Sequence, residues 1–235
     1  LAEKWGADVI RDSDGTKLSD EILDAGYDIY STLCIIRDHN EWAKQHPDCL
    51  QQSFLSTDPV IAAEGPLTVR PMAGFFAEQF RINDRPEAMH YWQVWDRTAD
   101  KPLPVGAWRW DASAGTVTVA EPVPFHAYTV SFLAWRLWEE INMYNHVTNH
   151  WTSEHLLPVD PRTAEAQDYL YSWLQAWCES HPQTNVVRFT SMFYNFVWIW
   201  GSDDRNRNLF TDWGSYDFTV SEKALDDFAA AYGYA

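Results

Sequence analysis

The chain has 235 residues, of which 46% are apolar and 22% charged, so it is a globular chain that can bury a full core and not a disordered one. Its net charge of −17 argues against nucleic acid and anionic membranes as partners, because both select basic patches. Three cysteines without a Cys-x-x-Cys pair favour free thiols in a reducing compartment. No apolar run reaches membrane-spanning length, and we expect a cytoplasmic protein.

Residues 1–63 have the pattern of alternating strands and helices. Residues 1–6 resemble the last turn of a helix already under way, so we expect the sequence to be a piece of a longer protein. Residues 7–10 and 28–36 are predicted strands, each followed by polar residues. Between them, Ser19 precedes two acidic residues and Gly26 follows, which predicts a short capped helix.

Residues 64–126 are rich in proline and glycine and contain short aromatic strands, which predicts a β-rich insertion. A hairpin is expected from strands 108–110 and 116–119 with the connecting loop 111–115.

From residue 127 onward, strand and helix patterns alternate again, with predicted strands at 128–137 and 185–190. Asp160 and Pro161 predict the start of a helix. Its buried face is expected to hold Ala166, Leu170, Trp173, Leu174 and Trp177. Ser221 and Gly233 are predicted to bound a last helix.

These elements predict the N-terminal half of a (β/α)8 barrel of the TIM type, covering residues 1–235 and interrupted by the insertion at 64–126. About four barrel strands are expected, half of what such a barrel needs. A doubly wound sheet is less favoured because no Gly-x-Gly-x-x-Gly follows a predicted strand.

The first polar strand end, Arg11 to Thr16, allows two interpretations. Asp12 and Asp14 match the short nucleophile loop of haloacid-dehalogenase-type phosphatases, which require Mg²⁺. Arg11 interrupts the apolar run that should precede such a nucleophile, and its positive charge would compete for the negative charge of the nucleophile. The other interpretation is a barrel strand that offers Arg11 to an anion and two carboxylates to sugar hydroxyls.

Arg11 and Arg188 each follow two apolar residues on a predicted strand. At equivalent depths of one barrel they would converge on one cleft, where guanidinium groups bind phosphate or carboxylate well. A structural ion pair with a neighbouring carboxylate is the alternative for each.

The amide of Asn145 and the imidazole of His146, together with the phenol of Tyr144, suit a polyhydroxylated ligand. Tyr194 and Trp213 are further candidates for contact with a sugar, and a few of the 14 tryptophans remain for a ligand cleft once the core is filled. We predict no metal site, because the neighbouring histidines lack a His-Glu-x-x-His pattern or a cysteine partner.

Several separate blocks, in the same order, give the chain a resemblance to the galactosyl-hexosamine phosphorylases, also called the lacto-N-biose/galacto-N-biose phosphorylase family. These blocks are residues 4–16, 40–44, 128–134, 143–146, 186–190 and 192–194. The resemblance implies an N-terminal (β/α) barrel in a glycosyltransferase-type phosphorylase. Such an enzyme cleaves a β-galactosyl disaccharide with inorganic phosphate, with inversion, to α-galactose 1-phosphate and a free hexosamine.

The resemblance implies neither a metal nor an organic cofactor, since phosphate is a co-substrate. It also implies that Arg11 contacts sugar and phosphate, that Asn145 contacts either, and that Arg188 binds phosphate. Asp12 and Asp14 would bind hydroxyls or hold Arg11. The family's general acid resembles an aspartate in a Gly-Asp-x-Trp-Ile-Gly segment, which this sequence lacks.

We therefore expect the general acid beyond residue 235, and an isolated chain that is inactive until the remaining portion of the enzyme completes it. A non-catalytic carbohydrate-binding module and the Mg²⁺-dependent phosphatase remain as alternatives. The acceptor sugar stays open among N-acetylglucosamine, N-acetylgalactosamine and rhamnose, and so does assembly into a homodimer.

Overall fold

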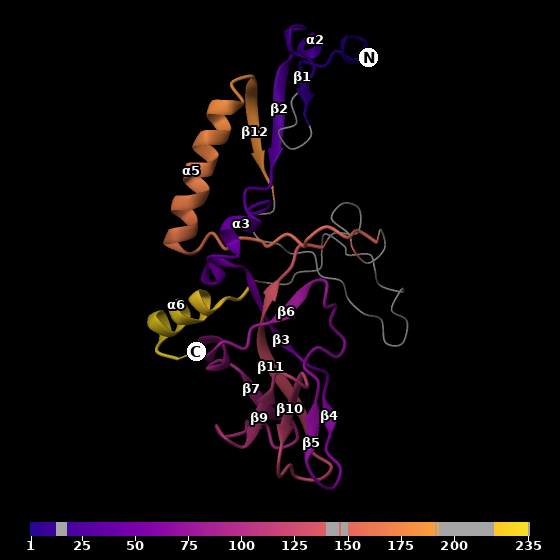
Figure 1. The fold of residues 1–235 in the computed structure, drawn as a ribbon, viewed down its shortest axis with the longest axis vertical. Helices are drawn as coiled ribbons and strands as arrows, with labels where there is room; N and C mark the ends of the chain where they lie inside the picture. Colours follow the sequence, from indigo (N-terminus) through magenta and orange to yellow (C-terminus); the bar gives the residue numbers. More distant parts are fainter. Residues whose placement is uncertain (13–17, 140–145, 147–149, 191, 193–218, 235) are drawn as a thin grey trace. The chain divides into compact units, whose positions relative to one another are not determined.

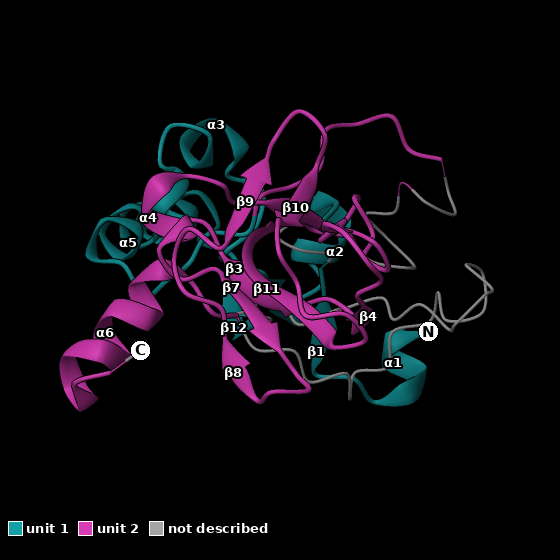
Figure 2. Ribbon diagram, turned by 90° about the horizontal axis from the view of Figure 1, so that it is seen from below, with its two compact units in different colours: residues 1–49, 158–193 teal, residues 50–157, 194–235 magenta. Residues whose placement is uncertain are grey.

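A computed structural model describes residues 1–12, 18–139, 146, 150–190, 192 and 219–234 (Figure 1). The chain divides into two compact units, which are coloured separately in Figure 2. Unit 1 comprises Leu1–Cys49 and Pro158–Phe193, and unit 2 comprises Leu50–Leu157 and Tyr194–Ala235. No helix among the described residues is both long and apolar enough to cross a membrane.

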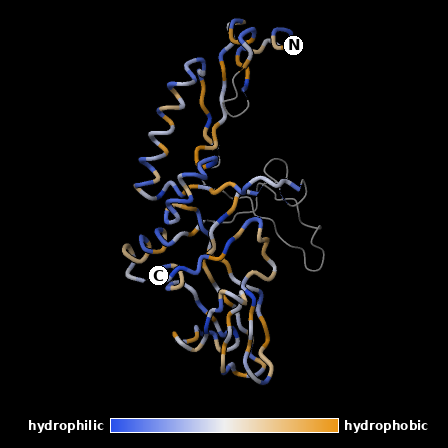
Figure 3. Tube along the Cα trace, viewed as in Figure 1, coloured by the Kyte–Doolittle hydropathy of each residue, from blue (hydrophilic) through white to orange (hydrophobic). Residues whose placement is uncertain are grey.

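Unit 1 is an α/β unit built on a three-stranded parallel sheet in the order β1-β2-β12. Figure 3 shows hydrophobic and hydrophilic residues mixed along β2 and β12, and most of the β12 residues are exposed because this strand lies at the edge of the sheet. Its elements are α1 (Ala2–Trp5), β1 (Val9–Arg11), α2 (Asp20–Leu23), β2 (Asp28–Leu33), α3 (Asn40–Ala43), a 3-10 turn (Pro47–Cys49), α5 (Ala164–Ser180) and β12 (Thr184–Phe189).

The predicted helix ends and buried helix face of unit 1 agree with the structure, except for the start of α5. Ser19 is the N-cap residue of α2, and Gly26 beyond it has a φ of 78°, which a glycine adopts without steric cost. Helix α5 begins later than expected, because Thr163 and not Asp160 caps it, with its hydroxyl accepting a hydrogen bond from the Ala166 amide. Three of its predicted apolar residues, Ala166, Leu170 and Trp177, are buried.

Helix α5 is tied to the segment after β2 through His39. This histidine is 4% exposed, and its Nε2 donates to the Ile35 carbonyl at 2.8 Å. The Tyr169 hydroxyl donates to Nδ1 at 3.2 Å, and the rings of Tyr169 and Trp173 meet the imidazole edge to face. The histidine therefore serves as a core residue that joins helix and sheet.

Unit 2 contains a six-stranded antiparallel sheet and a three-stranded one. Its elements are β3 (Gln52–Ser56), β4 (Val60–Ile61), β5 (Leu67–Val69), β6 (Phe80–Ile82), α4 (Pro86–Met89), β7 (Gln93–Asp96), β8 (Lys101–Pro102), β9 (Trp108–Asp111), β10 (Thr116–Val119), β11 (Ala127–Arg136) and α6 (Glu222–Tyr232). The three-stranded sheet has the order β5-β10-β9, and β9 and β10 form the predicted hairpin.

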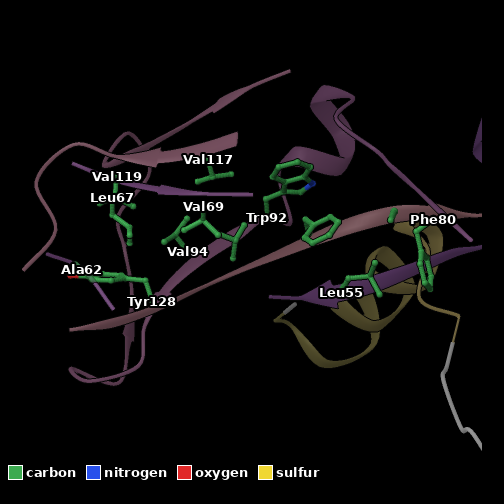
Figure 4. Packing of buried hydrophobic residues seen from close by; sticks show 13 residues of the cluster. Leu55, Ala62, Leu67, Val69, Phe80, Trp92, Val94, Val117, Val119 and Tyr128 are labelled. Carbon is green, nitrogen blue, oxygen red and sulfur yellow. The ribbon is translucent and has the colours of Figure 1, made fainter. Parts of the chain in front are cut away.

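The core of unit 2 lies between its two sheets. Val117 and Val119 of β10 face Val94 of β7 and Tyr128 of β11 across this core (Figure 4). Phe132 of β11 is fully buried, with Phe75 and Trp92 against its ring. The arrangement is that of two sheets packed face to face with apolar side chains on the inner faces.

Strand β11 corrects one expectation. The apolar run at 128–137 was predicted to be a barrel strand, but β11 pairs antiparallel with β3, β4, β6 and β7 at the centre of the large sheet. A strand buried on both faces has the same apolar run in either kind of sheet, so the pattern could not distinguish them.

The β-rich region consequently extends beyond 64–126 on both sides. The described residues contain three parallel strands and no closed barrel, so the half barrel stays a prediction.

The C-terminal helix α6 belongs to unit 2 and confirms its predicted ends. Ser221 accepts a hydrogen bond from the Ala224 amide, and Gly233 ends the helix with a φ of 78°. The Glu222 carboxylate accepts hydrogen bonds from Arg85 at 2.9 Å and from Asn83 at 2.8 Å. These contacts connect the helix start to the segment between β6 and α4.

Candidate functional site: the arginine face of the parallel sheet

The two arginines predicted to bind an anion flank β2 in one sheet. Arg11 of β1 pairs with Tyr30, and Arg188 of β12 pairs with Thr32. Side chains at positions i and i+2 of a strand lie on one face, and partners in a ladder share that face. Arg11, Tyr30, Thr32 and Arg188 therefore project from the same face of unit 1, here called the arginine face, and both arginines are solvent-exposed.

Tyr30 and Thr32 complete this face, although neither was among the predicted site residues. A hydrogen bond from Thr32, then one from Arg188 and the charges of Arg188 and Arg11, lower the pKa of Tyr30 below its ordinary value. The alternation of side chains along 28–36 is the signal that would have identified both residues. It puts Tyr30 and Thr32 on one face of β2 and Ile29 and Ser31 on the other.

Asp12 lies on the other side of the sheet. Its amide donates to the Tyr30 carbonyl at 3.0 Å, which extends the β1 pairing by one residue. Its carboxylate accepts a 2.6 Å hydrogen bond from the hydroxyl of Ser31, the residue next to Tyr30 on β2. Asp12 is only 3% exposed. A sugar-binding role for Asp12 stays a prediction, and its burial favours a structural role.

His146, a predicted sugar contact, belongs to unit 2 and is held by Glu139. The buried Glu139 carboxylate accepts hydrogen bonds from the His146 amide and, at 2.7 Å, from Nδ1 of its ring. Nε2 lies 2.7 Å from the Ser153 carbonyl. Both ring nitrogens therefore face oxygens that only accept hydrogen bonds.

A second histidine completes the cluster in unit 2. The His155 ring stacks on that of His146 with centroids 3.7 Å apart, and its Nε2 lies 3.7 Å from the Glu139 carboxylate. Burial, followed by the charge of His146, lowers the pKa of His155 and favours its neutral form. Glu139 and the two histidines are called the Glu139 cluster below.

The Glu139 cluster has the residue types of a metal site. Its candidate ligand atoms lie within 4.8 Å of one another. However, both ring nitrogens of His146 are engaged with Glu139 and Ser153, whereas a metal ligand needs a neutral ring with a free nitrogen. The geometry fits a hydrogen-bonded anchor for His146 better than a metal centre, and the expectation of no metal stays a prediction.

The remaining predicted site residues lie outside the described part of the chain. These are Asp14, Tyr144, Asn145, Tyr194 and Trp213. Their roles therefore stay predictions.

Comparison with known proteins gives the family. The model of the lacto-N-biose phosphorylase N-terminal TIM barrel domain matches residues 1–235. The chain belongs to this family. The resemblance noted in the sequence blocks is thereby confirmed.

Curated relatives from this family match over the whole chain. It is 59% identical over 234 residues to a D-galactosyl-β-1→4-L-rhamnose phosphorylase of Lachnoclostridium phytofermentans, covering 100% of this chain and 32% of that protein. It is 41% identical over 235 residues to a 1,3-β-galactosyl-N-acetylhexosamine phosphorylase of Bifidobacterium longum, covering 100% of this chain and 31% of that protein. The chain thus spans about a third of the length of the curated relatives it matches.

Proposed function

We propose that this chain is the N-terminal part of a galactoside phosphorylase. The enzyme cleaves the β-galactosyl bond of a disaccharide with inorganic phosphate and releases α-galactose 1-phosphate and the acceptor sugar. The observation that carries the proposal is the match of a phosphorylase domain over residues 1–235, joined to the two arginines on one face of the sheet.

In this reaction a phosphate oxygen forms a bond to the anomeric carbon from the side opposite the acceptor. The glycosidic C–O bond breaks, its electron pair stays on the acceptor oxygen, and a carboxylic acid protonates that oxygen. Phosphate is already nucleophilic, so the protein must position it and offset its charge. Arg11 and Arg188 are proposed for this task, and the general acid is proposed to lie beyond residue 235.

We further propose that strands outside this sequence complete a barrel next to β12. Among the described residues β12 is an edge of the parallel sheet. Val187 and Phe189 of this strand are 37% and 46% exposed. An edge strand with unpaired backbone groups and exposed apolar side chains can pair with a further strand. In a completed barrel the arginine face would look into the interior, where the ligands of such barrels bind at strand ends.

For the acceptor we propose L-rhamnose. Identity over this chain is 59% to the galactosyl-rhamnose phosphorylase, against 41% and 37% to two 1,3-β-galactosyl-N-acetylhexosamine phosphorylases. Assays in the synthetic direction would test this choice. With α-galactose 1-phosphate as donor, L-rhamnose is expected to be a better acceptor than N-acetylglucosamine or N-acetylgalactosamine, and a preference for either hexosamine would contradict it.

The test of the main proposal uses the complete gene product that carries this sequence. It is expected to release α-galactose 1-phosphate from β-1,4-galactosyl-L-rhamnose only when phosphate is present. Arg188→Ala should raise the KM for phosphate about 10- to 100-fold, as expected for loss of a charged hydrogen bond of ~1.5–3 kcal/mol. Arg109→Ala, an exposed arginine of β9 in unit 2, is the matched control and should leave this KM unchanged.

Other outcomes would identify the alternatives. Binding of galactosyl disaccharides without turnover would favour a carbohydrate-binding module. Mg²⁺-dependent hydrolysis of phosphate esters would favour the phosphatase, which is not favoured here because its nucleophile, Asp12, is almost inaccessible at 3% exposure. Either result would overturn the phosphorylase proposal.

A further inference from the structure

The arginine face carries a phenol between its two cations. Tyr30 lies on the central strand β2, directly beside Arg11 of β1 and two residues before the level of Arg188 of β12. The Tyr30 side chain is partly exposed to solvent. An anion that bridges the two guanidinium groups must therefore pass over or contact the Tyr30 side chain.

The neighbours of the Tyr30 hydroxyl are consistent with this register. Hydrogen bonds with Thr32 and Arg188 and the charges of both arginines lower the pKa of Tyr30. A phenol offers one donor proton and two acceptor lone pairs. When Arg188 donates to the oxygen, the proton of the hydroxyl remains available for an acceptor such as a phosphate oxygen.

Thr32 lies on the same face of β2, two residues beyond Tyr30, and its side chain is 6% exposed. Its hydroxyl interacts with that of Tyr30, so the buried threonine supports the phenol beside Arg188. Among the described residues of β2, the one carboxylate on this face is Asp28, two residues before Tyr30 at the start of the strand.

We propose that Tyr30 is a further phosphate-binding residue, whose hydroxyl donates to the phosphate held between Arg11 and Arg188. This inference rests on the proposed function and adds to it a residue outside the family blocks described above. A hydroxyl donor between two guanidinium groups gives the bound phosphate a third direction of contact, which two charges alone do not supply. Loss of the Tyr30 hydroxyl should therefore weaken the binding of phosphate and not that of the galactoside.

The experiment compares Tyr30→Phe with Tyr27→Phe in the complete protein. Tyr27 directly precedes the first residue of β2, three residues before Tyr30, and is the matched control. Tyr30→Phe should raise the KM for phosphate about 10-fold or more, with the KM for the disaccharide and kcat within twofold of wild type. Tyr27→Phe should leave all three constants unchanged. A Tyr30→Phe variant with the wild-type KM for phosphate, or one that loses only kcat, overturns the inference.

A spectroscopic measurement tests the same contact without turnover. The difference in phenolate absorbance between wild type and Tyr30→Phe isolates the titration of Tyr30. Adding inorganic phosphate should move this titration to higher pH, because a bound anion disfavours the phenolate. No movement at saturating phosphate contradicts the inference. If the wild-type enzyme shows no phosphate-dependent turnover, the proposed function fails, whereas normal turnover with an insensitive Tyr30→Phe variant removes only the role of Tyr30.

Discussion

Ser31 Oγ donates a 2.6 Å hydrogen bond to the Oδ2 atom of Asp12, and both side chains are almost fully buried. Ser31 lies in turn 3.1 Å from the Thr184 hydroxyl, so this contact joins all three strands of the parallel sheet. The pair connects the end of β1 to the centre of unit 1, on the side away from Arg11. This contact favours a structural role for Asp12.

Replacing Asp12 with asparagine should lower the free energy of unfolding by about 1–3 kcal/mol, because a buried charge-assisted hydrogen bond is weakened. The change would appear as a lower midpoint in urea unfolding of the complete protein. Asp8→Asn, at an exposed position before β1, serves as the control and should have little effect. Unchanged stability together with a raised KM for the disaccharide would instead make Asp12 a sugar-binding residue.

Stability should depend on pH through His39. Burial lowers the pKa of His39, which outweighs the opposing hydrogen bond to the Ile35 carbonyl. The unfolded chain binds a proton below about pH 6.5, whereas the folded chain does so only at lower pH. The contribution is therefore complete above pH 6.5 and is lost as pH falls through the folded-state pKa.

His39→Gln should accordingly destabilise the protein most at pH 7.5, and its difference from wild type should shrink at pH 5. Unfolding in urea at both pH values measures this difference. His90→Gln, at an exposed histidine after α4, is the control and should change the free energy of unfolding little. An equal loss for His39→Gln at both pH values would contradict the interpretation.

In the Glu139 cluster, we expect His146 to be held by its hydrogen bond to the Glu139 carboxylate and not by a metal ion. Glu139→Gln removes the carboxylate that accepts from His146 and should lower the free energy of unfolding by about 1–3 kcal/mol. Glu87→Gln, at an exposed position of α4, is the control. EDTA should leave the melting temperature of the wild type unchanged, and stoichiometric Zn²⁺ binding that Glu139→Gln abolishes would contradict the hydrogen-bonded description.

The core of unit 2 should be sensitive to truncation at Phe132. This ring is fully buried, with its centroid 6.0 Å from that of Phe75 and 5.7 Å from that of Trp92. Phe132→Ala should cost about 3–5 kcal/mol through lost burial and the cavity left behind. Phe125→Ala, at a ring that is 80% exposed, should change stability little. Differential scanning calorimetry would compare the two, and equal melting temperatures would refute the assigned core.

The sequence alone determined the features that depend on near neighbours in the chain. Ser221 and Gly233 bound α6 because capping acts within one helical turn, and the β9–β10 hairpin follows from its short loop. The two apolar residues before Arg11 and before Arg188 predicted equivalent depths in the sheet, and the register puts both arginines on one face but offsets them by two residues along β2.

Only the tertiary structure decided which partner each strand takes and which face each side chain joins. The apolar run of β11 fits a parallel or an antiparallel sheet equally well, and its pairing with four other strands made the choice. Asp12 and Arg11 are adjacent in sequence, yet the pleat of β1 sends them to opposite faces, so that one is buried against Ser31 and the other joins Tyr30. Hydrogen bonding between strands is non-local, and for that reason no pattern within a single segment could specify it.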